Sequence, residues 1–154
     1  MLQNPEHILR VRTSIPLPIG RVFDFFATAD NLQEITPRHL GFRILTPRPF
    51  EMRQGTLIDY ALSLFGIPFR WRTEITLWRP PYEFVDVQLR GPYAQWIHHH
   101  RFFESDGATV IEDEVRYRLP VPLLGLVALP FVRHLLNQIF KYRQTRIREL
   151  LTTG

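Results

Sequence analysis

The sequence has 154 residues, of which 45% are hydrophobic and 22% charged, and it contains no cysteine. This length and apolar content suit one folded domain, over residues 1–154, and argue against a disordered chain. The lack of cysteine excludes disulfides, thiolate metal sites and cysteine nucleophiles, and fits a reducing compartment. The first residues lack the basic start and apolar run of a signal peptide, and the most apolar stretch, residues 119–132, is interrupted by prolines. We therefore expect a cytoplasmic protein.

The positive charge is concentrated near the C-terminus. The chain carries 19 Lys and Arg against 15 Asp and Glu, and residues 130–154 hold five of the basic residues with a single acid. The excess of four positive charges therefore belongs to this segment. A charged helix face is most often simply solvated, and no groove-reading motif accompanies it, so we expect no nucleic-acid partner. Docking of this helix on a protein partner stays an alternative, and no oligomeric state is predicted.

The first third of the chain predicts one strand and two short helices. Residues 8–14 alternate in polarity, with Leu9, Val11 and Thr13 on one face. A helix is expected over residues 20–28. A second begins at Asp30, where the pattern resembles a capping box, and stops at Pro37.

From residue 42 onward the polarity alternates with period two, which predicts strands over residues 42–46, 56–64, 69–77, 84–90, 93–103 and 109–119. In the strand of residues 84–90, the apolar face is assigned to Val85, Val87 and Leu89, opposite Asp86. Residues 131–151 return to a helical period with one apolar stripe. An antiparallel meander with one buried face, curled around this last helix, predicts an α+β fold with about seven strands.

Three segments resemble the START/SRPBCC superfamily, in particular its polyketide cyclase/dehydrase-like ligand-binding branch. They are Pro18-x-x-x-Val22-Phe23-x-Phe25-Phe26 with Leu32 and Pro37, then Arg90-Gly91-Pro92-Tyr93-x-x-Trp96-x-His98-x-His100-x-Phe102 with Asp113-Glu114-Val115-x-Tyr117-x-Leu119-Pro120, and Phe140-x-Tyr142-Arg143. The last two are also similar to a bacterial branch sometimes fused to a nucleotide-sugar-epimerase-like domain. The resemblance implies a helix-grip fold, with a deep apolar cavity between the curved sheet and the C-terminal helix.

Two histidines and an aspartate form the most informative polar group. His98 and His100 share a strand face with Trp96 and Phe102. If Ser105–Ala108 forms a four-residue hairpin loop, His100 lies opposite Asp113 and His98 lies opposite Val115. A carboxylate beside an imidazole raises its pKa and makes it a candidate general acid or base.

Three interpretations of this group stay open. In the first, the pair satisfies itself in the core or orients a ligand. In the second, His100 and Asp113 are catalytic in a cyclase or dehydratase reaction. In the third, they join His98 in a plausible three-ligand metal site. Nothing else in the sequence requires a metal, so neither a metal nor another cofactor is predicted.

Arg143 falls in the apolar stripe of the last helix. It has three alternatives: to bind an anionic ligand group, to pair with an acid on the sheet, or to reach solvent past the sheet edge. Aromatic side chains are expected on the same interior. The full predicted ligand-binding set is Tyr60, Trp71, Thr73, Trp96, His98, His100, Asp113, Tyr117 and Arg143.

Residues 119–131 are apolar and are interpreted as a loop that covers the cavity. Alternatively, they form a gate that touches a membrane transiently, with Arg133 and Lys141 near anionic headgroups. Taken together, the sequence predicts a carrier or sensor that binds a hydrophobic small molecule, lipid-like or polyketide-like. The alternatives are a cyclase/dehydratase-type enzyme using His100 and Asp113, and a protein-interaction module.

Overall fold

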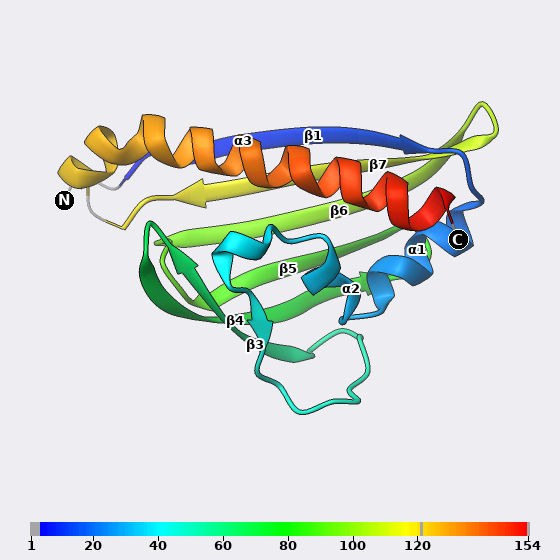
Figure 1. Cartoon of the computed structure of the whole chain (residues 1–154), viewed down its shortest axis with the longest axis horizontal. Helices are drawn as coiled ribbons and strands as arrows, with labels where there is room; N and C mark the ends of the chain where they lie inside the picture. The colour runs from blue at the N-terminus through cyan, green and yellow to red at the C-terminus, as the bar shows by residue number, and fades with distance from the viewer. Residues whose placement is uncertain (1–3, 121, 154) are drawn as a thin grey trace.

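The computed structural model describes residues 4–120 and 122–153, and for residues 122–126 it describes the backbone only. In chain order the elements are β1 (His7–Ile15), α1 (Ile19–Ala27), α2 (Asn31–Glu34), the 3-10 helix η1 (Arg38–Leu40), β2 (Arg43–Ile44), β3 (Leu57–Leu64), β4 (Ile67–Arg79), β5 (Glu83–Arg90), β6 (Gln95–Ser105), β7 (Ala108–Arg118) and α3 (Pro122–Thr152). Figure 1 shows α3 running lengthwise over the sheet.

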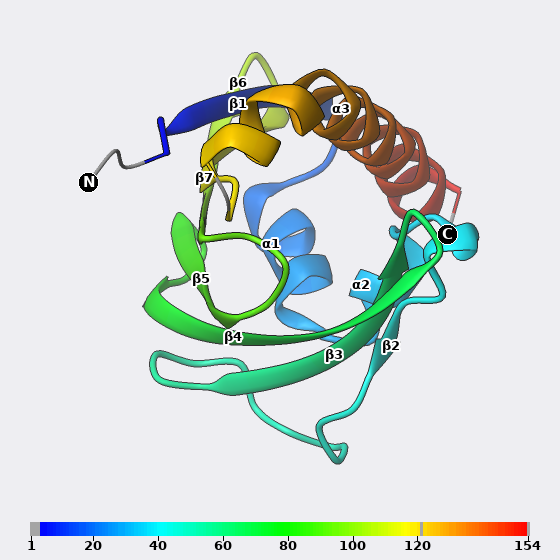
Figure 2. The same ribbon diagram turned by 90° about the vertical axis from the view of Figure 1, so that its left-hand side faces the viewer.

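Across the described residues, seven strands form one antiparallel sheet in the order β1-β7-β6-β5-β4-β3-β2. The sheet curls until its two edge strands approach each other, and α3 lies across the open side between them (Figure 2). Every strand from β2 to β7 pairs with its neighbour in the chain, and β1 closes the order against β7. The predicted helix-grip α+β fold is confirmed.

The hydrophobic core of the described residues forms three clusters: one on β2, β3 and β4 (Ile44, Ile58, Tyr60 and Ile75), and two toward the two ends of the curled sheet. At one end, Phe23 of α1 is 2% exposed, and its ring meets Phe84 and Phe102 edge-on. Ile147 and Leu151 of α3 belong to the same cluster. At the other end a second cluster packs around the middle of α3, formed by Tyr93, Trp96, Val115, Tyr117, Leu119, Leu136 and Phe140.

The last helix begins earlier than the apolar stripe predicts. The segment interpreted as a loop up to Phe131 is helical from Pro122 onward, and Pro130 lies inside the helix. A proline at a first helical position loses no hydrogen bond, so Pro122 does not delay the start. The side chains of residues 123–126 lie outside the described residues, and the gate stays a prediction. None of the helices in the described ranges is long and apolar enough to cross a membrane.

Two local predictions also need correction. Asp30 does not cap α2 with its side chain, and it bonds Arg48 instead. In β4 a bulge near Thr76 shifts the register. The alternation that places Thr73 and Ile75 inside does not extend to residue 77, and the Trp78 ring packs on Phe84 at 5.3 Å.

The turn between β6 and β7 is tighter than predicted. Ser105 pairs with Ala108, so only Asp106 and Gly107 form the loop, and both have positive φ, 51° and 78°. Such a two-residue turn suits an Asp-Gly pair, because its twist matches the twist of the flanking strands. The register beyond the turn is the same as for the predicted loop.

Candidate functional site

The β6–β7 register brings the predicted histidines and aspartate together. His100 pairs with Asp113, His98 with Val115, Trp96 with Tyr117 and Phe102 with Ile111, as the hairpin argument predicts. His98, His100 and Asp113 are all buried, at 3%, 4% and 7% exposure. The predicted register is confirmed, and it places a carboxylate among two imidazoles inside the fold.

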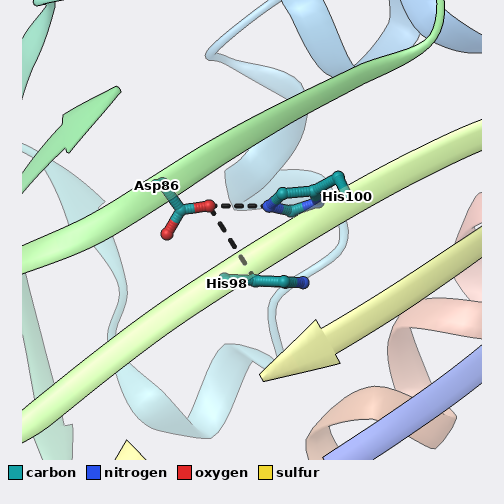
Figure 3. Close-up of side chains that lie close together, drawn as sticks. All are labelled: Asp86, His98 and His100. Carbon is teal, nitrogen blue, oxygen red and sulfur yellow. Dashed lines mark hydrogen bonds and ion pairs between the residues drawn. The ribbon is translucent and has the colours of Figure 1, made fainter. Parts of the chain in front are cut away.

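A second carboxylate, which the sequence pattern assigned to the outer face, completes the group. Asp86 of β5 pairs with His98 of β6, on the side opposite β7. In Figure 3, Asp86 points from β5 toward both imidazoles. The inner face of β5 therefore carries Phe84 and Asp86, and the assignment of Val85, Val87 and Leu89 to the buried face is wrong. We call Asp86, His98, His100 and Asp113 the His–Asp cluster.

The shortest contacts in the cluster run diagonally across the strands. His98 Nε2 lies 2.7 Å from Asp113 Oδ1, and His100 Nε2 lies 2.6 Å from Asp86 Oδ2. His100 Nδ1 is 3.3 Å from Asp113 Oδ1, a contact too poorly aligned for a hydrogen bond. His98 Nδ1 is 3.9 Å from Asp86 Oδ2. Each carboxylate therefore contacts both imidazoles, and each imidazole lies between two carboxylates.

The two imidazoles are stacked, with ring centroids 3.6 Å apart, and this proximity governs their protonation. Burial and the charge on His100 lower the pKa of His98 to about 4, although the hydrogen bond to Asp113 opposes the shift. Burial alone would lower the pKa of His100, but the attraction of Asp113 and the hydrogen bond to Asp86 outweigh it, and its pKa is raised. Of the two stacked imidazoles, His100 is therefore the one that keeps its added proton to the higher pH.

Both carboxylates are ionised. Burial by itself raises the pKa of Asp113 and of Asp86, but the hydrogen bonds and positive charge of the imidazoles hold both pKa values below the usual range. With His98 neutral, its Nε2–H donates to Asp113, which leaves Nδ1 as the unprotonated nitrogen on the side of Asp86. When His100 is protonated, the cluster therefore carries two negative charges and one positive charge.

The donor set has the residue types of a metal site but not the orientation. The ligand atoms of Asp86, His98 and His100 lie within 4.8 Å of one another. An imidazole nitrogen binds a metal through the lone pair in its ring plane. The ring planes of His98 and His100 are only 24° from parallel, so their lone pairs do not converge on one point. One ring would have to rotate before both could bind the same ion.

A cavity lies next to the His–Asp cluster, under α3. Its volume is about 170 Å³, and its wall is mostly aromatic and aliphatic. Asp86, His98 and His100 are part of that wall, and Arg143 of α3 is another part. Phe84 stacks on the His100 ring at 3.9 Å and so holds that ring flat against the cavity wall.

Most of the predicted ligand-binding residues line this cavity: Tyr60, Trp71, Thr73, Trp96, His98, His100 and Arg143. Asp113 and Tyr117 are not among the lining residues that the described part of the chain provides. Asp113 lies behind the imidazoles and accepts a hydrogen bond from His98. Tyr117 lies at the far end of β7, where its ring packs 6.0 Å from Tyr93 and 5.3 Å from His7.

Sequence reasoning missed Asp86 and much of the apolar wall. Phe25, Phe26, Leu32, Ile139 and Phe140 line the cavity from the helices and the segments beside them. The one sequence signal for Asp86 is Phe84 two residues earlier, because residues two apart in a strand share a face. The stronger apolar pattern of Val85, Val87 and Leu89 outweighed it.

Comparison with known proteins gives one family and several solved structures. Residues 15–140 match the family described as polyketide cyclase / dehydrase and lipid transport. A comparison with curated protein sequences finds no match.

The solved structures are similar over nearly the whole chain. The protein TTHA0849 from Thermus thermophilus has a TM-score of 0.75 at 16% identity, covering 97% of this chain and 98% of that one. The Zhui aromatase/cyclase from Streptomyces sp. R1128 also has a TM-score of 0.75, at 14% identity, covering 96% and 94%. A nucleoside-diphosphate sugar epimerase from Corynebacterium glutamicum is 26% identical, with a TM-score of 0.67. That match covers 94% of this chain but only 29% of the epimerase.

Proposed function

Because the chain belongs to the polyketide cyclase / dehydrase and lipid transport family, we propose that it binds a compact, largely apolar molecule of one or two rings in the cavity under α3. The observation that carries this proposal is the cavity itself, with its mostly apolar wall and a few polar groups contributed by the sheet and by α3. Small-molecule sites typically combine apolar walls with a few placed polar groups.

The size of the cavity favours a compact ligand over a long acyl chain. Its volume is about 170 Å³. An apolar protein cavity of roughly 150 Å³ accommodates benzene, whereas pockets for drug-sized ligands measure roughly 300–1,000 Å³. Aromatic side chains at the wall, among them Trp71 and Trp96, suit a flat ring, because ring pairs pack edge-on or offset.

The proposal is tested by a substitution that fills the cavity with a larger side chain. Ala29 lines the cavity between α1 and α2, and Ala29→Phe is expected to weaken binding of 2-naphthol at least about tenfold, because the new ring occupies the ligand's volume. Binding is measured by the fluorescence of the probe, and circular dichroism checks the fold. Ala94→Phe, at an exposed position outside the cavity, is the matched control and is expected to bind as the natural protein does.

Two results would contradict the compact-ring proposal. If 1-decanol binds the natural protein more tightly than 2-naphthol, the cavity opens for chains, and the ligand is lipid-like. If neither probe binds and native mass spectrometry of the protein from its source shows no small molecule, the binding function is wrong.

An enzyme of the cyclase/dehydratase type is the second candidate, favoured by the contact between His100 and Asp86 at the cavity wall. When a substrate carbonyl replaces Asp86 as the acceptor of the His100 Nε2–H, a protonated His100 can donate this proton to the carbonyl oxygen, and the released Asp86 carboxylate can remove an α-proton, which together form an enol. The two groups lie on the same side of the cavity, with His100 Nε2 2.6 Å from Asp86 Oδ2.

Enolisation can be tested without knowing the substrate. In D₂O, 2-tetralone is expected to exchange its α-protons faster with the protein than without it, as followed by NMR. His100→Gln is expected to abolish this acceleration, whereas His134→Gln, exposed on α3, leaves it unchanged. Exchange that persists in His100→Gln would remove the catalytic role, and the binding proposal would stand alone.

A further inference from the structure

Arg143 is the one strongly basic residue at the cavity wall among the described residues. It lies on the inner side of α3, three residues after Phe140, and its guanidinium carbon is 5.2 Å from the Phe140 ring centroid. This cation–π contact supports the side chain from within its own helix. The residue is only partly shielded from solvent.

In the described part of the chain, Arg143 has no carboxylate within 4.0 Å and no hydrogen-bond acceptor. Arg146, on the same helix, does form ion pairs. Its guanidinium nitrogens lie 2.7 Å from Glu149 Oε2 and 3.8 Å from Glu34 Oε2. Asp86, the acidic residue that lines the cavity among the described residues, already contacts His100 Nε2 at 2.6 Å. Of the three alternatives for Arg143, pairing with an acid of the sheet therefore does not occur.

A second unpartnered donor lines the same cavity. Trp71 Nε1 is buried, and it has no hydrogen-bond partner among the described residues. A buried N–H without an acceptor is destabilising, so such groups are usually paired in proteins. The Arg143 guanidinium and the Trp71 Nε1–H therefore both lack an acceptor, and an oxygen atom of a ligand in the cavity would provide one.

We propose that the ligand is a ring-bearing carboxylic acid whose carboxylate binds Arg143 while its ring occupies the apolar cavity. This inference rests on the binding function proposed above and names the class of its ligand. The planar guanidinium matches a carboxylate with two parallel N–H···O bonds, which neither water nor a lone hydroxyl reproduces. The carboxylate lies at the α3 side of the cavity, because Asp86 on the sheet repels a second negative charge.

The test compares two nearly isosteric probes. 2-Naphthoate carries a carboxylate, and 2-naphthamide carries an uncharged amide of the same shape. The natural protein is expected to bind 2-naphthoate at least about tenfold more tightly, because hydrogen bonds to a charged group are the stronger ones. Isothermal titration calorimetry at neutral pH measures both affinities.

Variants of α3 assign this preference to one side chain. Arg143→Met keeps the apolar stem and is expected to abolish the preference for 2-naphthoate, whereas Arg143→Lys restores part of it. Lys141→Met, an exposed position two residues away, is the matched control and keeps the preference. The thermal midpoint of Arg143→Met is expected not to fall, because the guanidinium has no carboxylate partner among the described residues to lose.

The outcomes separate this inference from the binding function. If both probes bind the natural protein equally, the cavity binds ligands and the role of Arg143 as a carboxylate anchor is overturned. The same conclusion follows if Arg143→Met retains the preference. If neither probe binds but 2-naphthol does, the ligand class is overturned while the binding function stands. If 2-naphthol and 1-decanol also fail to bind and native mass spectrometry shows no small molecule, the binding function fails, and the ligand class fails with it.

Discussion

Replacing Asp113 with alanine is expected to lower the free energy of unfolding by about 3–5 kcal/mol, because it removes one side of a buried charge group. Asp113 is 7% exposed, accepts a hydrogen bond from His98 at 2.7 Å and lies 3.3 Å from His100 Nδ1. Without Asp113, the His98 Nε2–H loses its acceptor, and the buried His100 imidazole loses a neighbouring negative charge. Urea unfolding followed by tryptophan fluorescence measures the loss.

The matched control is the next residue of the same strand. Glu114 points outward, and it pairs with Arg10 at 3.2 Å, where the Arg10 side chain is 70% exposed. Exposed ion pairs contribute less than about 1 kcal/mol, so Glu114→Ala is expected to have a small effect. Equal losses in the two variants would contradict the charge balance that we assign to the His–Asp cluster. Asp113→Asn, which keeps the shape but not the charge, is expected to lie between them.

The stability of the protein is expected to fall by roughly 3 kcal/mol as the pH decreases from 6.5 to 4, through His98 alone. The pKa of His98 is about 4 in the folded chain, against about 6.5 in the unfolded chain. Between these values the unfolded chain binds a proton at this residue and the folded chain does not. Acid therefore favours unfolding in this window, and the stability is regained as the pH rises.

His100 has the opposite linkage and acts in a different window. Its raised pKa gives stability that is fully present below the unfolded value and is lost as the pH rises through the folded value. The ionised Asp86 and Asp113, with lowered pKa values, lose their contribution only as the pH falls below the unfolded value of roughly 4. Near the middle of the window, at about pH 5–5.5, neither His100 nor these carboxylates contribute an appreciable slope of their own.

A variant isolates the contribution of His98. His98→Gln keeps an N–H donor in place of Nε2 but cannot titrate, so the free energy of unfolding is expected to vary less steeply between pH 6.5 and 4. His7 and His99 also have lowered pKa values, from burial first and then from nearby arginines, and they contribute in both proteins. The difference between the two pH profiles therefore belongs to His98. Superimposable slopes would show that His98 is protonated together with His100.

Both predictions depend on the same arrangement, in which two carboxylates flank a stacked imidazole pair and favour the protonated form of His100 over that of His98. In the function that we propose, this arrangement matters because His100 and Asp86 form part of the cavity wall. A ligand there meets a proton donor and a carboxylate on the sheet side and a guanidinium on the α3 side. The polar groups at opposite walls give a bound ring a defined orientation.

The order of elements and one hairpin register follow from local pattern. Alternation along β6 and β7, together with Ser105-Asp106-Gly107-Ala108, is sufficient to pair His100 with Asp113, because a short turn determines every later pair in a hairpin. The prediction holds although the turn has two residues instead of four. The early start of α3 is missed, because the prolines at positions 122 and 130 predict breaks, whereas both lie within the helix.

The sequence by itself determined the curved antiparallel sheet, the long closing helix and the two histidines that face inward, since each depends on a period of two or 3.6 residues. Only the tertiary structure decided that Asp86 joins them. The link between β5 and β6 runs through Gly91–Ala94 and is no tight turn, so the β5–β6 register depends on how the sheet curls. The same curvature leaves a cavity of about 170 Å³ under α3. Arg143 faces this cavity and has no acidic partner among the described residues. The pattern of polar and apolar residues specifies neither the cavity volume nor the lack of a partner for Arg143.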